Sequence, residues 1–173
     1  MKIPFSPPYI DDTVINEVVD SLRSGWITSG PKVKALEEEI KSFSGAKEVL
    51  CVNSWTSGAI MMLRWLGVKA DDEVIVPAYT YSATALAVLH AGAKPVMVDS
   101  GTDFNISVDA IRNAITSKTK AIIPVDIAGF PCDYDSIMQL VNAPEIREMF
   151  KAESAAQEKL GRILVMNDAA HSL

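Results

Sequence analysis

Residues 73–81 read EVIVPAYTY, a short apolar run that leads directly into small and aromatic residues. Similar runs recur between residues 48 and 166, and segments with helical spacing separate them. That alternation is typical of βα units that feed a mostly parallel sheet. Because the runs are apolar on both sides, we expect helices to cover both faces of the sheet. The chain is therefore predicted to have an α/β fold.

Strands and helices are predicted from the same pattern. The strands are expected at residues 48–52, 73–76, 95–98, 120–125 and 162–166, each bounded by polar, Gly or Pro residues. Apolar side chains at helical spacing predict helices within residues 14–22, 33–43 and 59–66. Ser107 and Asp133 are good N-cap residues for two later helices.

Residues 144–161 are charged and contain few large apolar side chains. This stretch is predicted to be a surface helix that adds nothing to the core. No repeat, low-complexity tract or flexible linker interrupts the chain, so we expect no domain boundary within it.

The composition argues against several classes of protein. With 49% hydrophobic and 22% charged residues among 173, the chain is expected to fold around one compact core. Its net charge of −6, without clustered Lys or Arg, argues against nucleic-acid binding. The sequence shows no signal-peptide pattern and no run of membrane-spanning length, so we expect a soluble cytoplasmic protein. Cys51 and Cys132 lack metal-ligand spacing, so we expect reduced thiols and no metal site.

The strongest candidate for chemistry is Asp168, which follows the last predicted strand. In an open α/β sheet, ligands lie off the carboxyl ends of the strands. A carboxylate at the end of a buried strand must be held ionised by a nearby cation, or it takes up a proton. A protonated pyridine nitrogen is one such cation, and pairing it with Asp is how enzymes that use pyridoxal 5′-phosphate (PLP) keep the ring electron-poor.

Other residues after the strands fit the same ligand, although each also has an ordinary structural explanation. Residues 53–58, NSWTSG, open a helix whose free amides and dipole favour a phosphate, or they form a simple N-cap. Tyr79 and Tyr81 place aromatic rings at the same edge, where one could stack on a flat ring, or both fill the core or an interface. Asp126 adds a second carboxylate at this edge, or it is a turn or cap residue. His171 could reach a ring substituent, or it is structural. Their convergence on one sheet edge favours a binding site.

Four separated strings carry a resemblance to a known family. They are GWITSGP at residues 25–31, VIVPAYTYSAT at 74–84, GAKPVMVD at 92–99 and NDAAH at 167–171. In these strings the chain resembles the DegT/StrS-type sugar aminotransferases, and the match runs in order along essentially the whole chain. The resemblance implies the three-layer α/β/α large domain of type I PLP-dependent transferases, with an incomplete sheet. Residues 1–173 would be the amino-terminal part of this PLP-binding domain, with the small carboxy-terminal domain absent.

The resemblance also implies an activity and a set of cofactor contacts. Members act as homodimers with sites at the interface, and they aminate keto groups on nucleotide-linked sugars for polysaccharide biosynthesis, usually with glutamate as amino donor. The implied contacts are the cofactor phosphate on Trp55, Thr56 and Ser57, the ring stacked on Tyr81, the ring nitrogen paired with Asp168, and the ring hydroxyl near His171. Two positions depart from the family pattern, because Asn167 stands where Glu is frequent and Trp55 where Gly is common.

The lysine that forms the Schiff base in this family is expected beyond Leu173, so we assign no catalytic residue. Lys94 and Lys120 lie at the entering ends of their predicted strands, opposite Asp168, and are not placed to replace it. Without that amine, we expect the chain to hold the cofactor but not to transaminate alone.

Two other interpretations remain open. One is a PLP-dependent sugar dehydratase, because relatives in this family use His in place of the lysine for dehydration. The other is a non-catalytic truncated or split subunit that acts through a partner chain. An incomplete sheet exposes an apolar edge and face, so we expect a homodimer or a complementing chain. Trp26 and Thr28 line the entrance to the site, or they are packing residues.

Overall fold

The computed structural model describes residues 7–172, which form two compact units. The first unit ends at Cys51 and the second begins at Val52. The sequence predicted no boundary within the chain, whereas the structure has two units. The sequence offers no linker as a signal at this point, and the division follows from where the chain makes its contacts.

The first unit contains two helices, α1 (Asp12–Ser24) and α2 (Pro31–Ser44). Asp11 caps α1 by accepting a hydrogen bond from the Val14 amide (2.9 Å). Neither helix contains a buried residue, and apolar side chains such as Val18 and Leu22 are exposed. The apolar faces of these helices therefore have no full cover within the described part of the chain.

Residues 48–52 are not a strand, so this prediction is wrong. The Cys51 amide instead donates to Glu37 Oε1 (2.8 Å), and Leu50 is exposed. An extended apolar run becomes a strand only when a neighbouring strand takes up its backbone hydrogen bonds. Among the residues that the structure describes, no strand pairs with this segment.

The second unit is built on a parallel sheet in the order β2-β1-β3-β4. The strands are β1 (Glu73–Pro77), β2 (Lys94–Val98), β3 (Thr119–Ile122) and β4 (Leu164–Val165). The predicted parallel sheet is confirmed, although β3 and β4 are shorter than expected. Pro124 has no N–H and cannot continue the ladder as a donor, and pairing resumes only as one bridge between Val125 and Asp168.

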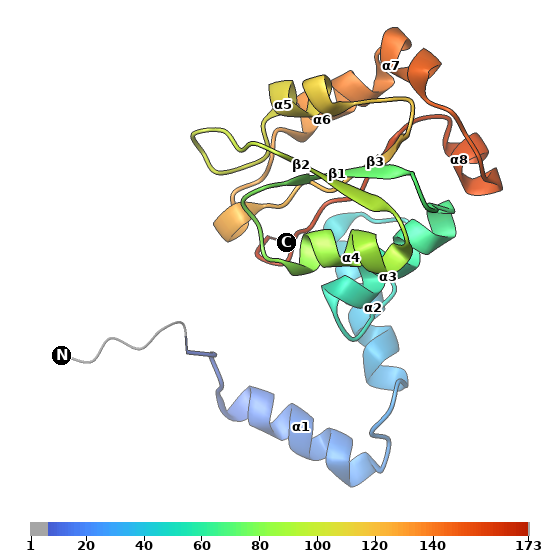
Figure 1. The fold of residues 1–173 in the computed structure, drawn as a ribbon. Helices are drawn as coiled ribbons and strands as arrows, with labels where there is room; N and C mark the ends of the chain where they lie inside the picture. Colours follow the sequence, from blue (N-terminus) through green and yellow to red (C-terminus); the bar gives the residue numbers. More distant parts are fainter. Residues whose placement is uncertain (1–6, 173) are drawn as a thin grey trace. The chain divides into compact units, whose positions relative to one another are not determined.

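Helices cover both faces of the sheet and give three layers, as expected (Figure 1). The first layer consists of α5 (Val108–Ala114), α6 (Tyr134–Asn142) and α7 (Pro144–Met149), and the opposite layer of α3 (Trp55–Leu66) and α4 (Ala83–Ala91). Successive residues of β1 alternate between two cores, since Ile75 packs with α5 and α6, whereas Val74 and Val76 pack with α3 and α4. The sheet thus divides the expected single core in two.

Two predicted N-caps are confirmed, and one helix of the second unit was not predicted. Ser107 accepts from the Ala110 amide (3.3 Å) and Asp133 from the Ser136 amide (3.0 Å), so both predicted N-caps are confirmed. Helix α4 was not predicted. Its sequence, ATALAVLHA, is apolar almost all round and therefore shows no helical period.

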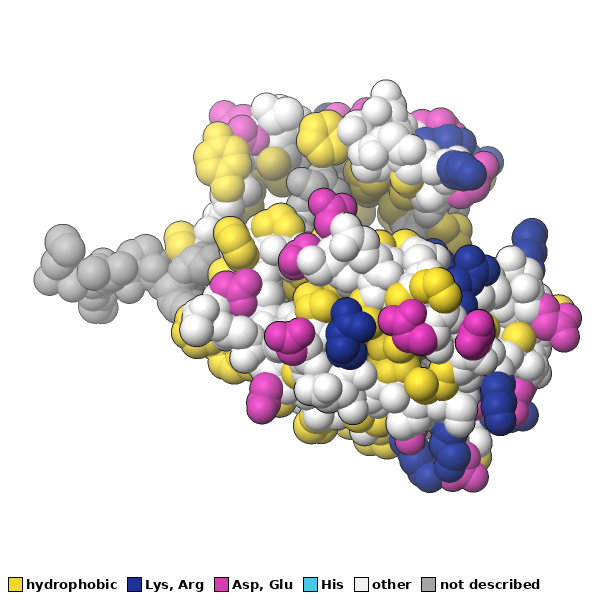
Figure 2. Space-filling view, turned by 90° about the horizontal axis from the view of Figure 1, so that it is seen from above, with side chains coloured by type: hydrophobic (Ala, Val, Ile, Leu, Met, Phe, Trp, Pro, Cys, Tyr) yellow, Lys and Arg dark blue, Asp and Glu magenta, His cyan; other side chains and the backbone are white. Residues whose placement is uncertain are grey.

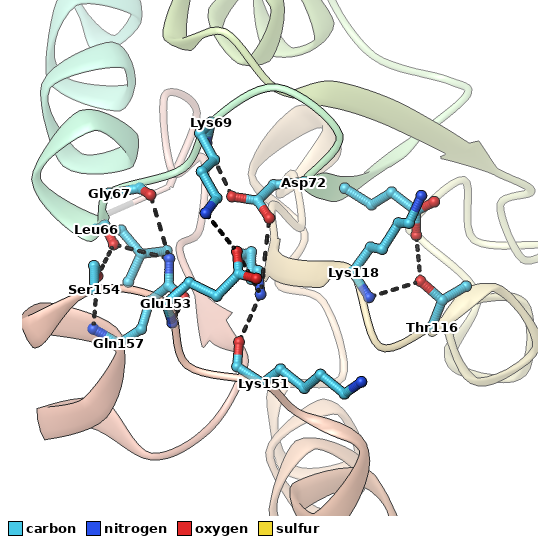
Figure 3. Close-up of polar contacts among 12 residues, drawn as sticks. Leu66, Gly67, Lys69, Asp72, Thr116, Lys118, Lys151, Glu153, Ser154 and Gln157 are labelled. Carbon is cyan, nitrogen blue, oxygen red and sulfur yellow. Dashed lines mark hydrogen bonds and ion pairs between the residues drawn. The ribbon is translucent and has the colours of Figure 1, made fainter.

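Residues 144–161 form two short helices, α7 and α8 (Ala155–Leu160), in place of the single surface helix expected. Gln157 of α8 is completely buried, and its Nε2 donates to the Leu66 carbonyl (3.1 Å) at the end of α3. Ser154 Oγ donates to the same carbonyl (2.6 Å) (Figure 3). These two bonds satisfy the Leu66 carbonyl, which has no acceptor role within α3 because it lies at the helix end. The segment is therefore part of the packed structure.

A buried ion pair lies at the amino edge of the sheet (Figure 3). Lys120 is buried, with 1% of its surface exposed. Its Nζ lies 3.7 Å from Asp72 Oδ1 and donates to the Lys151 carbonyl (2.6 Å). Asp72 Oδ2 accepts from the Lys69 amide (2.9 Å). Each buried charge at this edge therefore has a partner of opposite charge and a hydrogen bond.

The face over the α5, α6 and α7 layer carries charges of both signs. Figure 2, which looks down on the α5, α6 and α7 layer, shows Lys and Arg side chains interspersed with Asp and Glu. Such a mixture does not favour a phosphate backbone as partner. None of the helices in the described residues has the length and apolar character needed to cross a membrane.

Candidate functional site

A pocket of about 290 Å³ opens at the carboxyl edge of the sheet. This volume is just below the usual range for small-molecule sites, about 300 to 1,000 Å³. Its lining comes from the starts of α3 and α4 and from the segments after β1, β3 and β4: Trp55, Thr56, Thr80, Tyr81, Ala83, Val125, Asp126, Ile127, Asp168, Ala170 and His171. The pocket therefore lies where ligands bind in open α/β sheets.

Asp168 is the most unusual residue of this pocket, because it is buried (7% exposed) without an ion pair to any residue that the structure describes. Its backbone is fixed between strands, since its N–H donates to the Pro124 carbonyl (2.8 Å). Its carboxylate accepts one bond, from the Ala170 amide (3.2 Å). Burial raises the pKa of Asp168, and the Ala170 amide and His171 only partly oppose that rise. A cationic ligand would relieve this cost.

Asp126 is a second buried carboxylate in the lining (4% exposed), but its polar atoms are satisfied. It accepts hydrogen bonds from the Tyr134 hydroxyl (2.6 Å), the Ser172 hydroxyl (2.6 Å) and the Cys132 amide (3.0 Å). Burial alone would raise the pKa of Asp126, but these donors outweigh burial and hold its pKa below the ordinary value. Asp126 therefore stays ionised.

The amino end of α3 forms one wall of the pocket. Ser54 caps the helix by accepting from the Ser57 amide (3.1 Å), which leaves Trp55 and Thr56 in the lining. Ser57 is not in the lining, and its hydroxyl lies 3.0 Å from Ser54 Oγ. The amino terminus of a 12-residue helix such as α3 favours an anionic group such as a phosphate.

Tyr81 and His171 complete the set that the sequence proposed. Tyr81 is 80% exposed in the segment just before α4, so its ring face is free to meet a ligand. His171 is exposed at the pocket and adds positive charge near Asp168 when protonated. The structure thus brings five of the six proposed residues into one lining and leaves out Ser57.

The sequence missed the neutral part of the lining. Thr80, whose hydroxyl lies 2.9 Å from that of Thr84, and Ile127 and Ala170 were not singled out. Each lies in a segment that follows a strand, so listing every residue after each strand would have found them.

No lysine lines this pocket among the described residues. Lys94 begins β2 and pairs with Asp71, and Lys120 is buried beside Asp72. The prediction that both lie at the opposite edge from Asp168 is confirmed.

A larger hollow of about 460 Å³ lies within residues 21–33 of the first unit. Trp26 and Thr28 line it, together with Lys32, whose charge is already paired with Glu17 and Asp20. It offers no unpaired buried charge, so the sheet-edge pocket remains the candidate site.

The three-layer α/β fold with a parallel sheet is that of type I PLP-dependent aminotransferases. The chain belongs to the DegT/DnrJ/EryC1/StrS aminotransferase family, whose model matches residues 8–173. The family is PLP-dependent.

The chain is also similar to individual proteins over nearly its whole length. The chain is 48% identical to the PLP form of the putative sugar aminotransferase Spr1654 from Streptococcus pneumoniae, with a TM-score of 0.95 over 100% of this chain and 44% of that one. It is 38% identical over 155 residues to the spore coat polysaccharide biosynthesis protein SpsC of Bacillus subtilis, covering 89% of this chain and 39% of that protein. It is 40% identical over 173 residues to the uncharacterized protein MJ1066 of Methanocaldococcus jannaschii, covering 98% of this chain and 40% of that protein. The chain thus spans about 40% of the length of these curated relatives.

Proposed function

We propose that this chain supplies the ring-binding and phosphate-binding side of a PLP site in an aminotransferase that acts on keto groups of nucleotide-linked sugars. The observation that carries the proposal is Asp168, a buried carboxylate that lines the pocket and has no ion pair among the described residues. A protonated pyridine nitrogen has the charge and shape that such a carboxylate needs.

The residues present fit the cofactor on chemical grounds. Trp55 and Thr56, at the start of α3, would hold the phosphate, and Tyr81 would stack on the ring. Asp168 would pair with the ring nitrogen, and His171 would meet the ring hydroxyl. The Ser57 amide already serves the Ser54 cap, so Ser57 contributes to the helix start rather than to the lining. When bound, PLP supplies an electron sink for bonds to an amino group.

The protein's own role would be to bind and orient the cofactor and to keep its ring nitrogen protonated. Since no lysine lines the pocket within residues 7–172, the amine for covalent attachment would come from another segment or a partner chain. We propose a homodimer or a complementing chain, glutamate as amino donor, and a cytoplasmic location. The exposed apolar faces of α1 and α2 support the need for a partner.

Cofactor binding is tested with pyridoxamine 5′-phosphate, which has no aldehyde and binds only non-covalently. We expect saturable binding to this chain, followed by fluorescence or equilibrium dialysis, and reduced binding for Asp168→Asn. With PLP, borohydride should leave no covalent adduct on the pocket residues. Failure of the wild-type chain to bind pyridoxamine 5′-phosphate would contradict the cofactor proposal.

The reaction is tested by adding the complementing segment or chain together with glutamate and a nucleotide-linked keto-sugar. Transfer of the amino group to the sugar, detected by mass, supports the aminotransferase. A product that has lost water without gaining nitrogen would show a sugar dehydratase instead.

A further inference from the structure

Asp126 touches both ends of the turn that carries Asp168 and His171. Its N–H donates to the Asp168 carbonyl (3.0 Å), and its Oδ2 accepts from the Ser172 hydroxyl (2.6 Å). One residue on the segment after β3 therefore fixes the start and the end of the segment after β4. Loss of the Asp126 carboxylate would free the Ser172 end, while the Asp168 end keeps its backbone bonds.

The side chain of Asp126 is itself held in place. Its Oδ1 accepts from the Tyr134 hydroxyl (2.6 Å) and the Cys132 amide (3.0 Å), so both oxygens are engaged. With 4% exposure, the carboxylate has no room to turn toward solvent. Tyr134 and Cys132 thus anchor Asp126 to the start of α6.

The backbone after Asp126 is shaped to accept the same turn. Gly129 has a φ of +82°, and a Cβ there would lie 2.7 Å from the His171 carbonyl oxygen. Ala128, with a φ of +53°, lies in the left-handed region that few non-glycine residues adopt. A strained and closely packed loop is typical of a segment that positions a functional residue.

The charge of Asp126 also acts on the pocket. Both carboxylates line it, and the negative charge of Asp126 adds to burial in raising the pKa of Asp168, whereas His171 opposes it. Burial and Asp126 raise the pKa of Cys132 to about 11, and also raise the pKa of Tyr134, so both groups stay neutral near pH 7. Asp126, Asp168 and His171 are then the ionisable groups of the pocket lining at this turn.

We propose that Asp126 is a positioning residue: its N–H and its carboxylate clamp the 168–172 turn so that Asp168 and His171 face the pocket, and its charge makes the pocket more favourable for a cationic ring. This role rests on the proposed function, because the cationic ring is that of the cofactor. Asp126 is not required to touch the cofactor.

The test compares Asp126→Asn with Asp135→Asn, which removes one negative charge from an exposed position nearby. In cofactor-free protein, NMR titration of the carboxyl groups should show a lower pKa for Asp168 in Asp126→Asn and no change in Asp135→Asn. Affinity for pyridoxamine 5′-phosphate should fall about fivefold to tenfold in Asp126→Asn only.

Ser172→Ala opens one end of the clamp without changing charge. We expect faster amide exchange at residues 168–171 and a smaller loss of affinity, with little change in the pKa of Asp168. If Asp126→Asn does not fold, Ser172→Ala still decides, because unchanged exchange and affinity would overturn the clamp.

A folded Asp126→Asn protein with an unchanged Asp168 pKa and unchanged affinity would also overturn the proposal, and would leave Asp126 a purely structural residue. If the wild-type chain does not bind pyridoxamine 5′-phosphate, the cofactor proposal fails, whereas the cofactor-free titration still decides whether Asp126 acts on Asp168.

Discussion

Asp72 and Asp168 are buried at opposite edges of one parallel sheet, but among the described residues only Asp72 has an ion pair. At the amino edge, Asp72 lies 3.7 Å from Lys120 Nζ and accepts from the Lys69 amide. At the carboxyl edge, Asp168 accepts one bond from the Ala170 amide and has no ion pair among the described residues. A buried charge that serves the fold is neutralised within the fold. Asp168, which has no such partner among the described residues, lines the pocket at the carboxyl ends of the strands.

Removing the cation from Asp72 should have the largest effect on stability. Lys120→Met keeps the length of the side chain but leaves Asp72 buried without its ion-pair partner, which costs about 3 to 5 kcal/mol of unfolding free energy. Urea denaturation measures the loss. The control is Lys94→Met, since the Lys94–Asp71 pair is exposed and its loss should cost at most about 1 kcal/mol. Equal effects of the two variants would contradict the contrast between the edges.

The hydrogen bonds of Gln157 should have the next largest effect. Gln157→Leu leaves the Glu153 amide without its acceptor at 2.9 Å and removes a donor from the Leu66 carbonyl, at a cost of about 1 to 3 kcal/mol. The exposed Gln139→Leu is the matched control and should change stability little. A neutral Gln157→Leu would show that α8 does not need this side chain.

Asp168→Asn should separate stability from binding. Without cofactor, we expect the unfolding free energy to stay within about 1 kcal/mol of wild type, because an unpaired buried charge is replaced by a neutral group of the same size. Affinity for pyridoxamine 5′-phosphate should fall at least about tenfold, or 1.4 kcal/mol. A large loss of stability with unchanged affinity would make Asp168 structural.

The pH dependence of stability should have opposite signs for the two carboxylates of the pocket. The pKa of Asp168 is raised, so its contribution is present at low pH and is lost as pH rises through its folded pKa, above the ordinary Asp value. The pKa of Asp126 is lowered, so its contribution is present above the ordinary value and is lost as pH falls through its folded pKa. Unfolding curves of Asp168→Asn and Asp126→Asn against wild type, from pH 3 to 7, measure both slopes. Slopes of the same sign would contradict the assignment.

The sequence predicted those features that depend on local pattern. Asp168, Tyr81 and Thr56 were found because the carboxyl ends of parallel strands meet at one edge, and the caps Ser107 and Asp133 because a side chain and a nearby amide define them.

Features that depend on distant partners were not predicted. Residues 48–52 have strand composition but no neighbouring strand in the described chain. Gln157 is buried only because the end of α3 meets it, and α4 is too evenly apolar to show a period. The donors that hold Asp126 come from Tyr134 and Ser172, which the sequence order does not bring together.

The central claim is that Asp168 has no ion pair among the described residues and gains one from the ligand. The most direct test is the pKa of the Asp168 carboxyl, measured by NMR titration with and without pyridoxamine 5′-phosphate. We predict a pKa above the ordinary Asp range in the free protein, which falls when the ligand binds. A pKa at or below the ordinary range in the free protein would contradict the claim, as would a pKa that bound ligand does not change.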